Sequence, residues 1–220
     1  MSTAKKIILL IILLALPGSV FIFLHSFGEN EFGNVPVLYE NGVESSLNDC
    51  SFEPGVQHTI PPFSLVNEKG EPVTEEELEG TLTIVDFIFT TCPSICPKMS
   101  DAMVRVQESL KNDANVQIIS ISVNPEYDTP EVLQSYADRF GAIDGKWQFL
   151  TGDQNDIYNL ARCGFLLPVE DGGEVVEDFV HSPMFVLVDS QRRIRGYYNG
   201  LDPEKLETLV TEAKVLLTKF

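Results

Sequence analysis

The sequence predicts a mixed α/β domain of three layers, and three observations support this prediction. Two nearly continuous apolar runs, at 82–89 and 116–123, have the length and β-branched content of buried strands. Stretches predicted as helices follow them at 98–111 and 130–140. A hairpin at 184–198 and a last helix at 203–217 continue the alternation. Strands and helices in this order predict a mixed central sheet covered by helices.

The remaining predicted elements are shorter. A strand at 61–67 leads into a turn at 68–70, and 75–78 forms one acidic helical turn. Thr129 is placed to cap the helix that begins at Pro130. A strand at 147–150, a helix at 154–162 and a loop around 171–173 precede the hairpin, and no internal repeat is present. This order of elements has the shape of a thioredoxin-like domain with N-terminal additions.

Size and charge restrict the classes of function. The 220 residues suffice for one domain plus an anchor, and a 44% hydrophobic content suffices for a core. Lys and Arg number 15 against 33 Asp and Glu, for a net charge of −18. Such a charge repels nucleic acid, whereas it favours solubility and attracts cations or a basic partner.

The N-terminus predicts a membrane anchor. Lys5 and Lys6 precede an uncharged run at 7–24, which would form a helix about 27 Å long, close to the thickness of a bilayer. This places the short N-terminus in the cytoplasm and the domain on the extracytoplasmic, periplasmic side. A cleaved signal peptide is the alternative, although 20–24 is still apolar after the break at 17–19. The expected division is 1–25 for the cytoplasmic N-terminus and transmembrane helix, 26–57 for a juxtamembrane linker and 58–220 for the domain.

Cys92 and Cys96 have the most distinctive chemistry. They lie where a buried strand gives way to a helix, and the helix N-terminus favours a thiolate there. The usual redox motif is C-x-x-C, whereas three residues intervene here, so both sulfurs can converge on one ion. Pro93 and Pro97 stiffen the loop. A thiolate serves both disulfide exchange and metal binding, and its position alone does not distinguish them.

The donor set narrows the choice of metal. Two thiolates favour Cu(I), Zn(II) or an iron–sulfur cluster, but a cluster and structural zinc generally need four ligands. Cys50 and Cys163 are not spaced as partners in such a motif. Of the three histidines, His25 borders the anchor and His58 precedes the first strand. His181 comes just before the strand at 184–188, a segment that lies beside the cysteine loop in a thioredoxin-like plan.

Three motifs resemble those of the Sco/SenC family of copper-binding cytochrome c oxidase assembly proteins. They are FTTCPSICP at 89–97, SVNPEYDTPE at 122–131 and VHS at 180–182, in the family's order within a match over 58–217. The resemblance implies one copper ion per chain, bound by Cys92, Cys96 and His181. It also implies a partner, the copper-site subunit of a respiratory terminal oxidase, and a copper donor protein is compatible with the strong acidity.

The chain departs from the family pattern at two places. The second motif usually has an Asp where Asn124 stands here, which leaves the role of a carboxylate open. Cys50 and Cys163 are outside the pattern. They form an extra disulfide, stay unpaired, or one of them interferes with the Cys92–Cys96 pair.

The sequence is compatible with three functions. The leading hypothesis is a metallochaperone that delivers copper to the binuclear copper site of the oxidase. The second is a thiol–disulfide oxidoreductase that reduces the cysteines of that site, with Cys92 and Cys96 as catalytic residues. The third is a static Cys92–Cys96 disulfide in a domain that only binds a partner. A classical enzyme is not expected, and the oxidation state of the copper, the oxidase and the oligomeric state stay open.

Overall fold

The computed structural model describes residues 4–6, 15–19, 35–44, 50–167 and 183–218. The chain divides into two compact units, Met1–Asn34 and Val35–Phe220. Most of the apolar run at 7–24 lies outside the described residues. Within the described ranges, no helix has the length and apolar character needed to cross a membrane. The predicted transmembrane helix falls mostly on residues outside these ranges and stays a prediction.

The second unit has the predicted alternation of strands and helices. Its strands are β1 (Ser64–Asn67), β2 (Pro72–Thr74), β3 (Leu82–Ile88), β4 (Val116–Ser122), β5 (Trp147–Thr151), β6 (Met184–Val188) and β7 (Ile194–Asn199). Its helices are α2 (Ile95–Leu110), α3 (Pro130–Phe140), α4 (Gln154–Asn159) and α6 (Pro203–Leu217). Two short helical turns accompany them: η2 (Glu75–Leu78) is a 3₁₀ turn, and η3 (Leu160–Gly164) is a π-helical turn.

The described strands form one mixed sheet in the order β2-β1-β5-β4-β3-β6-β7. β3, β4 and β5 are parallel, with Ile88 opposite Ser122 at the carboxyl end of the first pair. β6 runs antiparallel to β3, and β1 antiparallel to β5. The mixed sheet and the thioredoxin-like order of elements confirm the predicted fold class.

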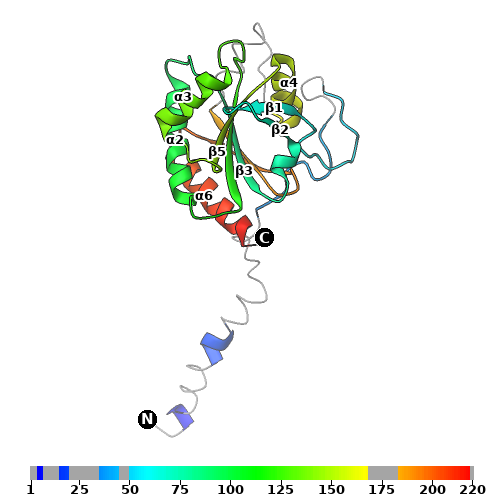
Figure 1. Ribbon diagram of the computed structural model, residues 1–220. Helices are drawn as coiled ribbons and strands as arrows, with labels where there is room; N and C mark the ends of the chain where they lie inside the picture. The colour runs from blue at the N-terminus through cyan, green and yellow to red at the C-terminus, as the bar shows by residue number, and fades with distance from the viewer. Residues whose placement is uncertain (1–3, 7–14, 20–34, 45–49, 168–182, 219–220) are drawn as a thin grey trace. The chain divides into compact units, whose positions relative to one another are not determined.

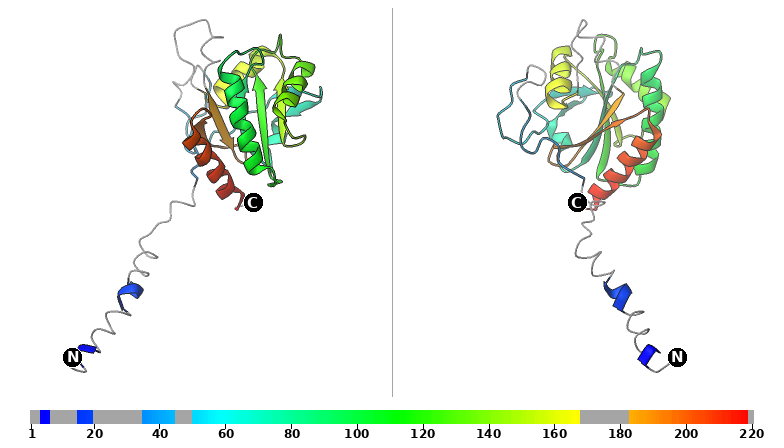
Figure 2. Two further views of the ribbon diagram at one scale, coloured as in Figure 1. Left: turned by 90° about the vertical axis from the view of Figure 1, so that its left-hand side faces the viewer. Right: turned by 180° about the vertical axis from the view of Figure 1, so that it is seen from behind.

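Helices cover both faces of the sheet (Figures 1 and 2). α2, α3 and α6 lie on one face, whereas α4 lies on the other. Leu82, Ile84 and Ile88 of β3 belong to the core cluster on the first face, and Val85 and Phe87 belong to the cluster on the second. All seven residues of β3 are buried, as expected for a central strand covered on both sides.

One helix boundary and one additional strand differ from the sequence prediction. α2 begins at Ile95 rather than at 98, so Cys96 and Pro97 lie in its first turn. Proline is tolerated there because the first N–H groups of a helix have no intrahelical acceptor. β2 was not expected, since Pro72–Thr74 is too short for its own sequence signal and pairs only because β1 lies beside it.

The segment before β1 is integrated into the domain. Val35 is 5% exposed, and the buried Arg195 donates from Nε to the carbonyl of Pro36 at 2.8 Å. The compact unit therefore begins at Val35, whereas the sequence predicts a linker up to residue 57. Short polar segments without periodicity give no signal for such tertiary contacts.

Cys50 and Cys163 form a disulfide, with Cα atoms 5.7 Å apart. This is the first of the three alternatives that the sequence left open. The bond joins the N-terminal segment to η3, and His58 adds a second link through a 2.7 Å hydrogen bond from Nε2 to the carbonyl of Gly164. Cys92 and Cys96 are free thiols.

Removing the disulfide is expected to destabilise the domain by about 2–5 kcal/mol, because the bond spans 113 residues and restricts the unfolded chain strongly. Urea unfolding of the double variant Cys50→Ser/Cys163→Ser measures this loss. Each single variant should lose the same stability, since either change breaks the bond. A double variant as stable as the wild type would contradict a stabilising role.

Candidate metal and redox site

The Cys92 sulfur lies at the N-terminus of α2. β3 ends at Ile88, and a turn follows in which the N–H of Cys92 donates to the carbonyl of Phe89 at 3.2 Å. The N–H of Cys96 donates to Cys92 Sγ at 3.4 Å. Ser94 is the N-cap residue, but its side chain makes no capping hydrogen bond. Cys92 Sγ therefore supplies the acceptor that a helix N-terminus needs.

This position favours the thiolate of Cys92. Partial burial opposes its ionisation, but the backbone N–H groups of Cys96, Ser94 and Ile95 outweigh this effect and lower the pKa of the thiol. The partial positive charge at the N-terminus of a helix acts in the same direction. The residue keeps 7% of its surface exposed, so its sulfur lies at the edge of the interior.

Cys96 has the opposite character. Only 1% of its surface is exposed, and it packs in the core cluster that contains Met99 and Tyr136. Burial, together with the neighbouring Cys92 and Asp86, raises the pKa of its thiol to about 12. The pair thus combines one thiol whose ionisation the helix N-terminus favours with one whose ionisation burial opposes.

A buried carboxyl group lies beneath this pair. Asp86 of β3 is 0% exposed, and burial raises its pKa to about 7. The hydroxyl of Ser120 donates to Asp86 Oδ1 at 2.5 Å and accepts from Trp147 Nε1 at 2.9 Å. Asp86 Oδ2 has no hydrogen-bond partner among the described residues.

The second motif lies directly beside the cysteine loop. The N–H of Val123 donates to the carbonyl of Ile88 at 2.8 Å, which joins the carboxyl ends of β4 and β3. The buried carboxylate of Asp128 accepts a hydrogen bond from the N–H of Thr90 at 3.0 Å. The first two motifs, which are about thirty residues apart in the sequence, thus form one surface of the site.

His181 lies outside the described residues, as do His25 and the loop around 171–173. The structure does describe Met184, three residues after His181, where β6 begins. β6 is antiparallel to β3, with Val186 opposite Val85, so the start of β6 lies at the end of the sheet from which the cysteine loop leaves. Within the described ranges, no three His, Cys, Asp or Glu residues are grouped to hold a metal ion.

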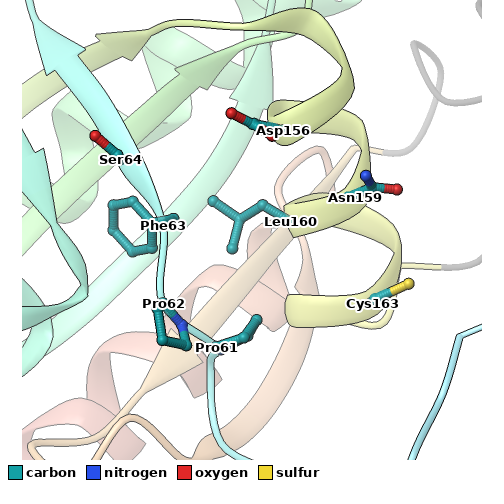
Figure 3. Close-up of a pocket in the computed structure, with 8 residues that line it drawn as sticks. All are labelled: Pro61, Pro62, Phe63, Ser64, Asp156, Asn159, Leu160 and Cys163. Carbon is teal, nitrogen blue, oxygen red and sulfur yellow. The ribbon is translucent and has the colours of Figure 1, made fainter.

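A pocket of about 470 Å³ has neither Cys92 nor Cys96 in its lining (Figure 3). It is formed between the segment leading into β1 and the helix α4 with η3, and it is lined by Pro61, Pro62, Phe63, Ser64, Asp156, Asn159, Leu160 and Cys163. Phe63 and Leu160 face each other across it. Cys163 at its rim is held in the disulfide. The pocket therefore contributes no reactive thiol.

The sequence motifs alone predict no role for Asp86 or Asp128. Asp86 had a usable signal, because it is the one charged residue within the apolar run at 82–89. Such a residue in a buried strand costs free energy unless it is neutral or paired. Asp128 had a weaker signal, since an Asp before a helix N-cap is common on the surface of proteins.

Comparison with known proteins finds relatives of this chain. The SCO1/SenC family model matches residues 53–216. The SCO1 protein homolog of Bacillus subtilis is 33% identical over 161 residues, which cover 72% of this chain and 83% of the relative.

Two solved structures share the fold. BsSco, a member of the Sco family of cytochrome c oxidase assembly proteins in which a disulfide switch was identified, superposes with a TM-score of 0.63 at 33% identity, covering 73% of this chain and 94% of that one. Copper-bound ScoI of Arabidopsis thaliana gives 0.57 at 29% identity, covering 72% and 97%.

The fold and the cysteine loop define a thioredoxin-like domain with a C-x-x-x-C pair at the start of its first long helix. The chain belongs to the SCO1/SenC family.

The two thiols are expected to differ strongly in reactivity. At pH 7, a thiol with a pKa of about 12 is ionised in only about one molecule in 100,000, whereas the pKa of Cys92 lies below its ordinary 9.0. Alkylation of the reduced full chain with iodoacetamide, followed by mass spectrometry, should modify Cys92 first. Cys96→Ser should keep this fast reaction, and Cys92→Ser should slow it at least about tenfold. Equal rates for both single variants would contradict the assignment.

Proposed function

We propose that this protein binds one copper ion through Cys92, Cys96 and His181 and delivers it to the copper-site subunit of a respiratory terminal oxidase. The observation that carries the proposal is the 3.4 Å hydrogen bond from the N–H of Cys96 to Cys92 Sγ, because it places the Cys92 thiol beside the first turn of α2, which holds Cys96. Family membership, a copper-bound relative and a relative that assembles cytochrome c oxidase support it.

The donor set fits a soft metal ion. Thiolates and imidazole suit copper, and sites with few ligands leave a coordination position open for a ligand of the receiving protein. Cys92 should bind the copper ion before Cys96 does, since the pKa of its thiol is already lowered. Cys96 is buried, and a bound cation would offset the cost of ionising it. The start of β6 beside β3 supports His181 as the third ligand.

Copper titration of the reduced full chain should give about one equivalent per chain, because the proposal assigns all three ligands to one site. Cys92→Ala, Cys96→Ala and His181→Ala should each lose this binding or weaken it at least about tenfold, since each removes one of three ligands. Two control variants should still bind one copper ion per chain. His58→Gln changes a histidine that bonds to Gly164, and Cys50→Ser/Cys163→Ser removes the disulfide, so neither removes a proposed ligand. A His181→Ala variant with unchanged affinity and spectrum would exclude the three-ligand site.

One observation favours a second function, reduction of the disulfide of the oxidase copper site. The opposite pKa shifts of the two thiols are those of a nucleophilic and a resolving cysteine. Cys92 thiolate would attack the partner's disulfide, forming a mixed disulfide and releasing one partner thiolate. Cys96, after losing its proton, would attack Cys92 Sγ, so that the Cys92–Cys96 disulfide forms and the second partner thiolate leaves. The partner gains the two electrons that the pair loses.

This reaction predicts a trapped intermediate. With a disulfide-bonded peptide of the oxidase copper site, reduced Cys96→Ser should accumulate a mixed disulfide through Cys92, because the resolving thiol is missing. Cys92→Ser should form little, since its remaining thiol is buried. Non-reducing mass spectrometry of the complexes identifies the linkage. Absence of exchange with the wild-type chain would exclude this second function while leaving copper delivery untouched.

We also propose that the domain faces an oxidising compartment, the periplasmic side of a membrane. The Cys50–Cys163 disulfide supports this location, since such bonds persist in oxidising surroundings. The apolar run at 7–24 after two lysines supports an N-terminal anchor. Cell fractionation tests it, because a shortened mature chain in the soluble fraction would exclude a retained anchor.

A further inference from the structure

The carboxylate of Asp128 joins the two motifs of the site. It is 0% exposed and accepts three hydrogen bonds. Oδ2 accepts from the N–H of Thr90 at 3.0 Å and from the hydroxyl of Ser122 at 2.5 Å, and Oδ1 accepts from the hydroxyl of Thr90. Ser122 Oγ accepts in turn from the N–H of Asn124 at 3.1 Å. One buried group thereby links the end of β3 to the end of β4.

The donor Thr90 lies inside the turn that presents Cys92. This turn is closed by the hydrogen bond from the N–H of Cys92 to the carbonyl of Phe89, so Thr90 is its second residue. Asp128 binds both the N–H and the hydroxyl of Thr90, which restrains its backbone and its side chain together. The position of Cys92 Sγ at the N–H of Cys96 depends on the conformation of this turn.

Capping of α3 does not account for this carboxylate. The N-cap of α3 is Thr129, whose hydroxyl accepts from the N–H of Val132 at 3.4 Å. The backbone N–H of Asp128 donates to the carbonyl of Asn124 at 2.9 Å and closes the loop of the second motif. The side chain of Asp128 is thus left to bind Thr90 and Ser122.

Asn124 takes a different part in the same loop. It contributes its backbone N–H to Ser122 Oγ and its carbonyl to the N–H groups of Tyr127 and Asp128. The carboxylate that the cysteine loop binds is therefore four residues further along the motif than Asn124, the position at which the chain departs from the family pattern.

We propose that Asp128 is a positioning residue for the Cys92–Cys96 pair. By holding Thr90, it keeps Cys92 Sγ at the N-terminal N–H groups of α2 and so sets the reactivity and the reduction potential of the pair. The inference rests on the proposed use of the two thiols under "Proposed function". It concerns geometry that exists before any metal binds, so it can be tested without copper.

The direction of the effect follows from the hydrogen bonds to sulfur. Donors to the Cys92 thiolate stabilise the reduced pair, and a pair with a stabilised reduced form has a less negative reduction potential. A loosened Thr90 turn should therefore make the potential more negative and slow the reaction of Cys92. A tenfold change in the dithiol–disulfide equilibrium corresponds to about 30 mV.

The test compares four variants of the full chain. Asp128→Asn replaces one acceptor oxygen by a donor, and Thr90→Val removes only the hydroxyl that bonds to Oδ1. Thr90→Ser keeps that hydroxyl and serves as the conservative rescue. Asp189→Asn is the matched control, since Asp189 is also buried, at 3% exposed, and accepts turn hydrogen bonds from Gln191 and Arg193 between β6 and β7.

Three quantities are measured for each variant without copper: the reduction potential of the Cys92–Cys96 pair in glutathione buffers, the alkylation rate of Cys92 at pH 7 and the urea unfolding midpoint. Asp128→Asn and Thr90→Val should shift the potential by about −30 mV and slow alkylation about tenfold. Thr90→Ser should stay near the wild type. Asp189→Asn should lower the unfolding midpoint and leave the potential unchanged.

Two results would overturn the proposal. One is a folded Asp128→Asn or Thr90→Val chain with the wild-type potential and alkylation rate. The other is an equal shift in Asp189→Asn, which would make the effect a general loss of stability. If Asp128→Asn does not fold, the Thr90→Val variant alone tests the proposal, because it removes only the hydroxyl that bonds to Asp128. Copper titration of the wild type separately decides the copper function, so each hypothesis can fail without the other.

Discussion

The parallel pairing of β3 with β4 is the constraint on which the rest of the site depends. Parallel strands end at the same edge of a sheet, so Ile88 lies opposite Ser122, and the two loops that follow leave side by side. Both strands are buried over their full length, which fixes their register through packing on both faces. The cysteine loop and the second motif can therefore share the buried carboxylate of Asp128.

One helical turn then creates two unlike thiols. Cys92 precedes α2 and meets its free N–H groups, whereas Cys96 is within the first turn and points into the core. The contrast arises from position, since a helix N-terminus stabilises negative charge and the interior penalises it. A pair of this kind suits both a metal ion that must be bound and released and a disulfide that must be exchanged, which is why the same geometry supports both proposed functions.

Sequence patterns predicted the central strands, the long helices and the cysteine loop well, because each has a strong local signal. β3 is an apolar run, and α3 has Thr129 and Pro130 at its start. Three other features have no such signal. β2 exists because β1 lies beside it, and Val35 is held against the domain because Arg195 binds the carbonyls of Val35 and Pro36. The Cys50–Cys163 bond joins residues 113 positions apart, so spacing alone could not select it from the open alternatives.

The sequence by itself determined the order of elements, the place of Cys92 and Cys96 between a strand and a helix, and the family to which the motifs point, since these depend on neighbours along the chain. The tertiary structure decided which groups surround the two thiols. Asp86 lies beneath Cys96 because α2 packs on the face of β3, and Asp128 reaches Thr90 because β3 pairs with β4. The identity of the thiols was thus local information, while their contrasting chemistry is a property of the folded sheet and helix.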